Sequence, residues 1–110
     1  MTAQDIETGR KNAIISYLTL IGAIIAYYLN NENKSAFASF HIRQSLGLWL
    51  TFFALGRIAG SFDSWYISSG FYVFFAVLFF FGFSNALGRK TEPVPLVGNL
   101  YQKLFAKLGI

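Results

Sequence analysis

The chain has 110 residues, of which 55% are hydrophobic, 19% are aromatic and only 13% are charged. A soluble domain carries roughly 25% charged residues, so this chain has too little polar surface to cover a small globule. It has no cysteine, which excludes disulfides, thiolate metal sites and a cysteine nucleophile. The net charge of +4 comes from cations scattered among segment ends, whereas nucleic-acid binding needs a basic face, so we expect no nucleic-acid partner. The composition predicts one all-α domain, residues 1–110, in a lipid bilayer.

The first segments are a polar N-terminal arm, residues 1–12, and an apolar run, residues 13–29. Thr8 or Asn12 could cap the helix that follows the arm. Seventeen helical residues cover about 25 Å, the short limit for a bilayer core, so we expect the first transmembrane helix here. A cleaved secretory signal is the alternative, but Asp5 and Glu7 dilute the positive charge and no small-residue cleavage site follows. Polar residues 30–35 form a turn in which Ser35 can cap the next helix.

The second expected span is residues 36–60, and it begins amphipathic. His41, Gln44 and Ser45 are spaced i, i+3 and i+4 and share one helix face. The first turns could lie at the lipid headgroups, with Arg43 and Arg57 reaching opposite membrane surfaces. Residues 66–87 form the third span, whose uniform apolarity between Phe71 and Phe83 is typical of a lipid-facing helix.

The tail differs in kind from the spans. Pro93 and Pro95 predict an extended link. Residues 96–108 then show an apolar face at helical spacing, with Lys103 and Lys107 on the polar face. This helix is too short to span, so we expect it to lie in the membrane interface plane; docking in a partner's groove is the alternative. The fold class is thus a membrane helical bundle with three transmembrane helices and a C-terminal amphipathic interfacial helix.

Three spans would place the first turn and the tail on one side of the membrane and the N-terminus on the other. The first-turn side then holds six cations against three, which favours a cytoplasmic tail. The two sets are Lys34, Arg43, Arg89, Lys90, Lys103 and Lys107, against Arg10, Lys11 and Arg57.

The residues offer little chemistry. There is one histidine, so a multi-histidine metal centre is excluded, and no carboxylate lies within a span to support a proton relay. No phosphate-binding glycine loop is visible. We therefore expect no enzyme activity, no cofactor and no metal. The candidate interface or lipid-contact residues are His41, Arg43, Gln44, Arg57, Glu92, Lys103 and Lys107. We also expect Arg43 to pair with Glu92 or with a lipid phosphate.

Three phrases, YYLNNENK, FASFHIRQSLGLWLT and EPVPLVGNLYQKLF, resemble a family of small bacterial membrane proteins labelled import-component-like. That label reflects a distant similarity to the twenty-kilodalton subunit of the chloroplast inner-envelope translocon. The resemblance implies a helical protein of the bacterial inner membrane that assists protein translocation, and it carries over no catalytic residue. The plant members are described as four-spanning, whereas this chain offers three spans and a surface helix.

Two functions follow as expectations. The first is a translocon-like component acting as an oligomer or with partners, because three short helices cannot enclose a water-filled path alone. The second is a non-catalytic accessory or structural subunit of a larger membrane complex, or a lipid-binding membrane protein. The expected partners are the lipid bilayer and further copies of this chain or other membrane proteins.

Overall fold

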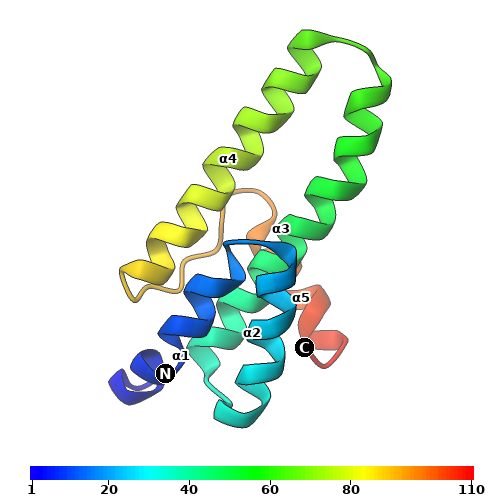
Figure 1. The fold of residues 1–110 in the computed structure, drawn as a ribbon. Coiled ribbons are helices and arrows are strands. Elements are labelled where there is room, and N and C mark those ends of the chain that lie inside the picture. Colours follow the sequence, from blue (N-terminus) through cyan, green and yellow to red (C-terminus); the bar gives the residue numbers. More distant parts are fainter.

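Five helices and no strands make up the fold in the computed structural model, which describes residues 1–110. The helices are α1 (Ala3–Ser16), α2 (Leu20–Asn33), α3 (Ala36–Ser61), α4 (Trp65–Leu87) and α5 (Gly98–Lys107). The molecule is elongated, with extents of 47 × 26 × 22 Å. Helices α1, α2 and α5 gather around the first half of α3, while the second half of α3 and α4 extend beyond them as two antiparallel helices (Figure 1). We call residues 46–87 the hairpin and the remainder the body.

The expected first span is not a single helix. Helix α1 ends at Ser16, and α2 starts at Leu20 after a tight reversal, so the two helices pack against each other. The break has a local cause: the Thr19 hydroxyl accepts a hydrogen bond from Gly22 N at 2.8 Å and starts a new helix. The indole of Trp49 donates to the Ser16 carbonyl, which occupies one acceptor at the end of α1. The prediction of a continuous helix over residues 13–29 is wrong for these reasons.

The N-terminal arm is helical from Ala3. Thr2 caps α1 by accepting from Asp5 N at 3.1 Å, so the expectation of a cap at Thr8 or Asn12 is wrong. The Asp5 carboxylate in turn accepts from Ala36 N and Phe37 N, both at 3.0 Å, at the start of α3. The N-terminus and the first turn therefore lie at the same end of the molecule, contrary to the expectation that they face opposite sides.

Helix α3 occupies almost the expected range, residues 36–60, and begins at the expected Ser35 cap, which accepts from Ala38 N at 3.2 Å. Its polar face is not at a surface, because His41, Gln44 and Ser45 are all fully buried in the body. Of the five helices, only α4 is long and apolar enough to cross a membrane. The expectation of three spanning helices is therefore wrong in number.

Helix α4 matches the third expected span, residues 66–87, but its two sides differ. Phe71, Phe75 and Phe79 recur every four residues and contact Phe52 of α3, with ring centroids 5.6, 5.6 and 6.2 Å apart. The other side of the helix has no protein partner: Val77 is 59% exposed and Phe80 is 72% exposed. Only part of the expected lipid-facing surface is thus free, because one phenylalanine row holds the hairpin together.

The tail folds back on α3 of its own chain, and its helix, α5, lies inside the expected range of 96–108. The Tyr101 ring covers Gly47, where an added Cβ would lie 2.3 Å from the ring, and the Tyr101 hydroxyl donates to Thr51 Oγ1 at 2.8 Å. Tyr101 and Phe105 are buried by this packing, whereas Leu100, Leu104 and Leu108 stay exposed. Half of the expected apolar face is therefore used within the chain.

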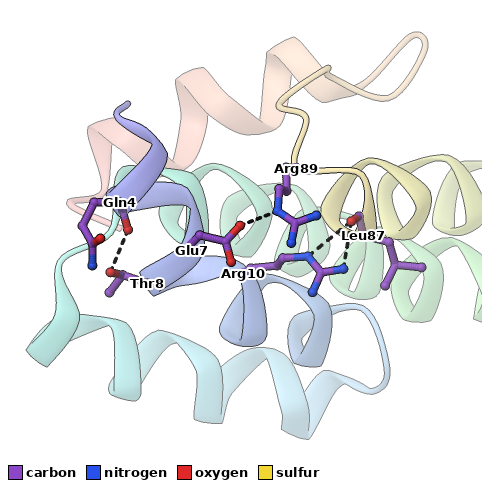
Figure 2. A network of polar contacts seen from close by, with 6 residues as sticks. All are labelled: Gln4, Glu7, Thr8, Arg10, Leu87 and Arg89. Atoms are coloured by element: carbon purple, nitrogen blue, oxygen red, sulfur yellow. Dashed lines mark hydrogen bonds and ion pairs between the residues drawn. The ribbon is translucent and has the colours of Figure 1, made fainter.

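Helix α1 also holds the end of α4 (Figure 2). The Arg10 guanidinium donates from Nε and Nη2 to the Leu87 carbonyl, at 3.2 and 3.0 Å, and so satisfies an acceptor at the C-terminus of α4. Three residues earlier on α1, Glu7 forms an ion pair with Arg89. Together with the hydrogen bonds of Asp5, these contacts join α1 to the first turn of α3 and to the last turn of α4.

Candidate functional site

The candidate site is a buried polar cluster built from three parts of the body. Helix α3 contributes His41 and Gln44, which lie one turn apart on the face that packs toward α1. The end of α1 contributes Tyr17, whose side chain enters the body where the helix reverses. The link between α4 and α5 contributes two backbone groups, the Lys90 carbonyl and the Val94 amide.

The hydrogen bonds form one continuous chain with a defined direction. The Lys90 carbonyl can only accept, so His41 Nε2, 2.7 Å away, carries the proton and donates. In the neutral ring His41 Nδ1 is then an acceptor, and the Tyr17 hydroxyl donates to it at 2.7 Å. Gln44 Nε2 donates to the Tyr17 oxygen at 2.8 Å, and Gln44 Oε1 accepts from Val94 N at 2.8 Å.

Aromatic rings enclose the imidazole. Tyr17, Phe37 and Phe40 meet His41 edge-on, at centroid distances of 5.5, 4.8 and 5.2 Å. His41 and Gln44 have no exposed surface, and no carboxylate hydrogen-bonds to either side chain. Ser45, which could have met His41, instead donates to the Ile42 carbonyl at 3.0 Å. With both ring nitrogens engaged, the arrangement fixes the position of the link backbone on α3.

Two of the three phrases quoted for the resemblance meet in this cluster through their HIRQ and EPVPLVG segments. Gln44 comes from the first phrase, Val94 comes from the second, and they are 50 residues apart in sequence. Pro93 also packs closely on Gly98, where an added Cβ would lie 2.7 Å from Pro93 Cβ. The spacing of the two phrases therefore has a structural reason, which is the docking of the link on α3.

Arg43 lies apart from its two neighbours in the motif. It sits at the opening between α2 and α3, half-buried, and its Nε is buried without a hydrogen-bond partner. Glu92 is exposed on the link, and the chain's one ion pair is the Glu7–Arg89 pair. The expected pairing of Arg43 with Glu92 is therefore wrong; the alternative, a lipid phosphate, stays a prediction.

The remaining candidate residues are dispersed over the surface. Arg57 is exposed on the hairpin near its tip, and Lys103 and Lys107 are exposed on α5. None of these three joins the buried cluster. The structure thus brings together His41 and Gln44 of the candidate set and separates the rest.

Sequence reasoning missed two important residues, Tyr17 and Asp5. Tyr17 was counted within an apolar run, although a tyrosine between Ser16 and Thr19 already indicates a polar interruption. Asp5 was counted only as a charge that dilutes a basic segment. Its hydrogen bonds from the backbone of α3, that of Phe37 foremost, lower the pKa of the Asp5 carboxyl below its ordinary value of 3.8.

Comparisons with protein-family models, with curated proteins and with solved structures give no significant match to this chain.

Proposed function

We propose that this chain is an integral membrane protein whose hairpin inserts in the bilayer, and that it serves as a non-catalytic subunit of a membrane assembly. The observation that carries the proposal is the unpartnered side of α4. Over 23 residues this helix has no charge, and its outward residues Val73, Val77 and Phe80 are each more than half exposed. Large exposed apolar surfaces of this kind mark membrane or protein contacts.

The second half of α3 accompanies α4 in this proposal. A 23-residue helix is about 35 Å long and matches a bilayer core of about 30 Å. The α3 segment is bound to it through the Phe52 contacts, and Leu50, Phe53 and Ile58 on its outer side are also more than half exposed. Arg57, its one cation, lies within two turns of the tip, where a long side chain can reach the interface. Trp65 and Tyr66 at the tip have the composition of an interfacial belt.

The charge distribution supports an orientation. Eight of the nine Lys and Arg residues lie outside residues 46–87, and Arg57 alone lies within the hairpin. Because the N-terminus and the first turn lie at the same end, these cations no longer divide as six against three. The positive-inside tendency then favours a cytoplasmic body and a hairpin tip that reaches the opposite surface.

The accessory role is supported by how the polar residues are used. His41 and Gln44 hold the link and so are committed to the fold. A role as a translocon-like component is the second candidate, and the HIRQ and EPVPLVG phrases favour it. That role requires further subunits, since two inserted helices enclose no path.

Cysteine accessibility tests the insertion directly, because the chain has no cysteine of its own. Single variants Gln4→Cys, Glu32→Cys and Ser61→Cys place one exposed thiol at the N-terminus, at the first turn and at the hairpin tip. With a membrane-impermeant maleimide on intact cells, we expect Ser61→Cys alone to react, and the other two to react after permeabilisation. Reaction of all three from one side, or recovery of the protein in a detergent-free high-speed supernatant, would refute the insertion.

Purification in mild detergent followed by mass determination tests the role. A stable foreign membrane protein in fixed ratio supports the accessory subunit. A discrete homo-oligomer supports the second candidate, and peptide flux after reconstitution would establish it. A strictly monomeric protein without partners would contradict both roles.

A further inference from the structure

The body contains a polar pocket that the buried cluster does not use. It lies at the turn between α2 and α3, has a volume of about 430 Å³, and is lined by Asn30, Asn31, Lys34, Ser39, Phe40 and Arg43 among others. This volume falls within the range of small-molecule sites. Two of the lining side chains are cations and none is an acid.

The Arg43 side chain forms no hydrogen bond within the protein. Its Nε is buried and donates to nothing, although a buried donor without a partner is costly. Ser39 Oγ accepts from Asn30 Nδ2 at 2.9 Å, so its own hydroxyl proton is free to point into the pocket. Asn30 is committed, since it also bonds the backbone of Ser35 through both ends of its amide. Lys34, Arg43 and Ser39 therefore offer free donors to the pocket, and no carboxylate lines it.

The neighbouring carboxylate does not neutralise these cations. Asp5 lies close by, at the start of α3, and its two oxygens accept from Ala36 N and Phe37 N. It does not line the pocket. Glu32 is exposed on the last turn of α2 and does not line the pocket either.

From this arrangement we propose that the pocket between α2 and α3 binds a phosphate group, with Arg43 and Lys34 as its charged ligands and Ser39 as a further donor. Arg43 and Lys34 line the same pocket, and a guanidinium without a protein partner together with an ammonium suits the several oxygens of a phosphate. The phosphate group belongs to an anionic lipid headgroup or to a soluble phosphate. The site lies in the body, so it does not depend on the insertion of the hairpin.

The test uses the full chain in an uncharged detergent. Phosphatidylglycerol, zwitterionic phosphatidylcholine and inorganic phosphate are titrated separately, and binding is measured by native mass spectrometry and by the shift in melting temperature. We expect saturable binding of phosphatidylglycerol, of inorganic phosphate or of both, and weaker binding of phosphatidylcholine, whose choline cation meets Lys34 and Arg43. Binding of phosphatidylglycerol without binding of inorganic phosphate identifies a site for a lipid headgroup. Binding of inorganic phosphate alone identifies a site for a soluble phosphate.

Three variants distinguish binding in the pocket from a general attraction of anions to the positively charged protein. Arg43→Gln and Lys34→Asn should each weaken binding at least tenfold, equivalent to about 1.4 kcal/mol. Asparagine suits the second position because Lys34 has a positive φ of 51°, which asparagine tolerates. Arg57→Gln removes an exposed cation from the same helix, far from the pocket, and should leave binding unchanged.

Two results would overturn the assignment. One is that both pocket variants, Arg43→Gln and Lys34→Asn, bind the ligand with an affinity within twofold of the wild type. The other is that Arg57→Gln loses as much affinity as the pocket variants do. Equal affinity for phosphatidylcholine and phosphatidylglycerol would also contradict it. Circular dichroism and gel filtration verify folding; if Arg43→Gln fails these checks, the Lys34→Asn result decides.

Discussion

Replacing Tyr17 with phenylalanine tests the buried cluster most directly, because it removes one oxygen and keeps the ring. That oxygen donates to His41 Nδ1 and accepts from Gln44 Nε2, so the substitution leaves two buried groups without partners. A buried polar group without a partner costs roughly 1–3 kcal/mol, so we expect a loss of roughly 2–6 kcal/mol in the free energy of unfolding. If the Gln44 amide turns toward another acceptor, only His41 Nδ1 is left without a partner, and the loss falls to roughly 1–3 kcal/mol.

Unfolding of the purified protein in mixed detergent micelles, followed by circular dichroism and by tryptophan fluorescence, measures this loss. Tyr28→Phe is the matched control, because Tyr28 is 67% exposed and its hydroxyl makes no protein hydrogen bond. A surface change of this kind lies within about 0.5 kcal/mol of the wild type.

The double variant Tyr17→Phe/Gln44→Leu completes a thermodynamic cycle. Residues that share one hydrogen-bond network couple by roughly 0.5–3 kcal/mol, so the two losses should not add. If Tyr17→Phe unfolds with the same free energy as Tyr28→Phe, or if the two losses add fully, the hydroxyl is not the centre of the network and the reasoning is refuted.

Two further predictions concern the contacts of α3 with the tail and with the N-terminus. Gly47→Val should displace α5, since even a Cβ there would lie 2.3 Å from the Tyr101 ring, and limited proteolysis should then cut the tail sooner; Gly70→Ala, with nothing within 4 Å, should leave the digestion pattern unchanged. Asp5→Asn should lower the free energy of unfolding at pH 7 by about 1 kcal/mol, because the amide has one acceptor oxygen where the carboxylate uses two, for Ala36 N and Phe37 N. Because the hydrogen bond from Phe37 N lowers the pKa of Asp5, its contribution is present above pH 3.8 and is lost as the pH falls through the folded-state pKa. Unfolding curves measured at intervals from pH 7 downward should therefore show the difference between wild type and variant shrink as the Asp5 carboxyl takes up its proton, and a difference that stays constant as the pH falls would contradict the capping role.

The sequence located α3, α4 and α5 well because each has a strong local signal. For these three helices the signal was an uncharged run, a serine cap or a helical period, each carried by neighbouring residues in the sequence. The reversal between α1 and α2 was missed because averaging over an apolar run hides a single cap, here Thr19 on Gly22. Thr19 is a common cap residue, but hydropathy alone does not decide whether this run forms one helix or two.

The candidate site was predicted in part for a related reason. The helical spacing of His41 and Gln44 placed them on one face, and the structure keeps them there. Their partners are a tyrosine 24 residues away and two backbone groups some 50 residues away, which no local pattern connects. The predicted ion pair between Arg43 and Glu92 is absent. The prediction was based only on their expected location on the same side of the membrane, and that does not bring two side chains into contact.

The position of α1 has a consequence for motion within the molecule. Asp5 and Arg10 of α1 bind the first turn of α3 and the last turn of α4, whereas residues 62–64 form hydrogen bonds only with α3 and α4. Because the short connection and the phenylalanine contacts join these two helices, the hairpin moves as one unit about its junction with α1, and Trp65 at its tip has the largest displacement.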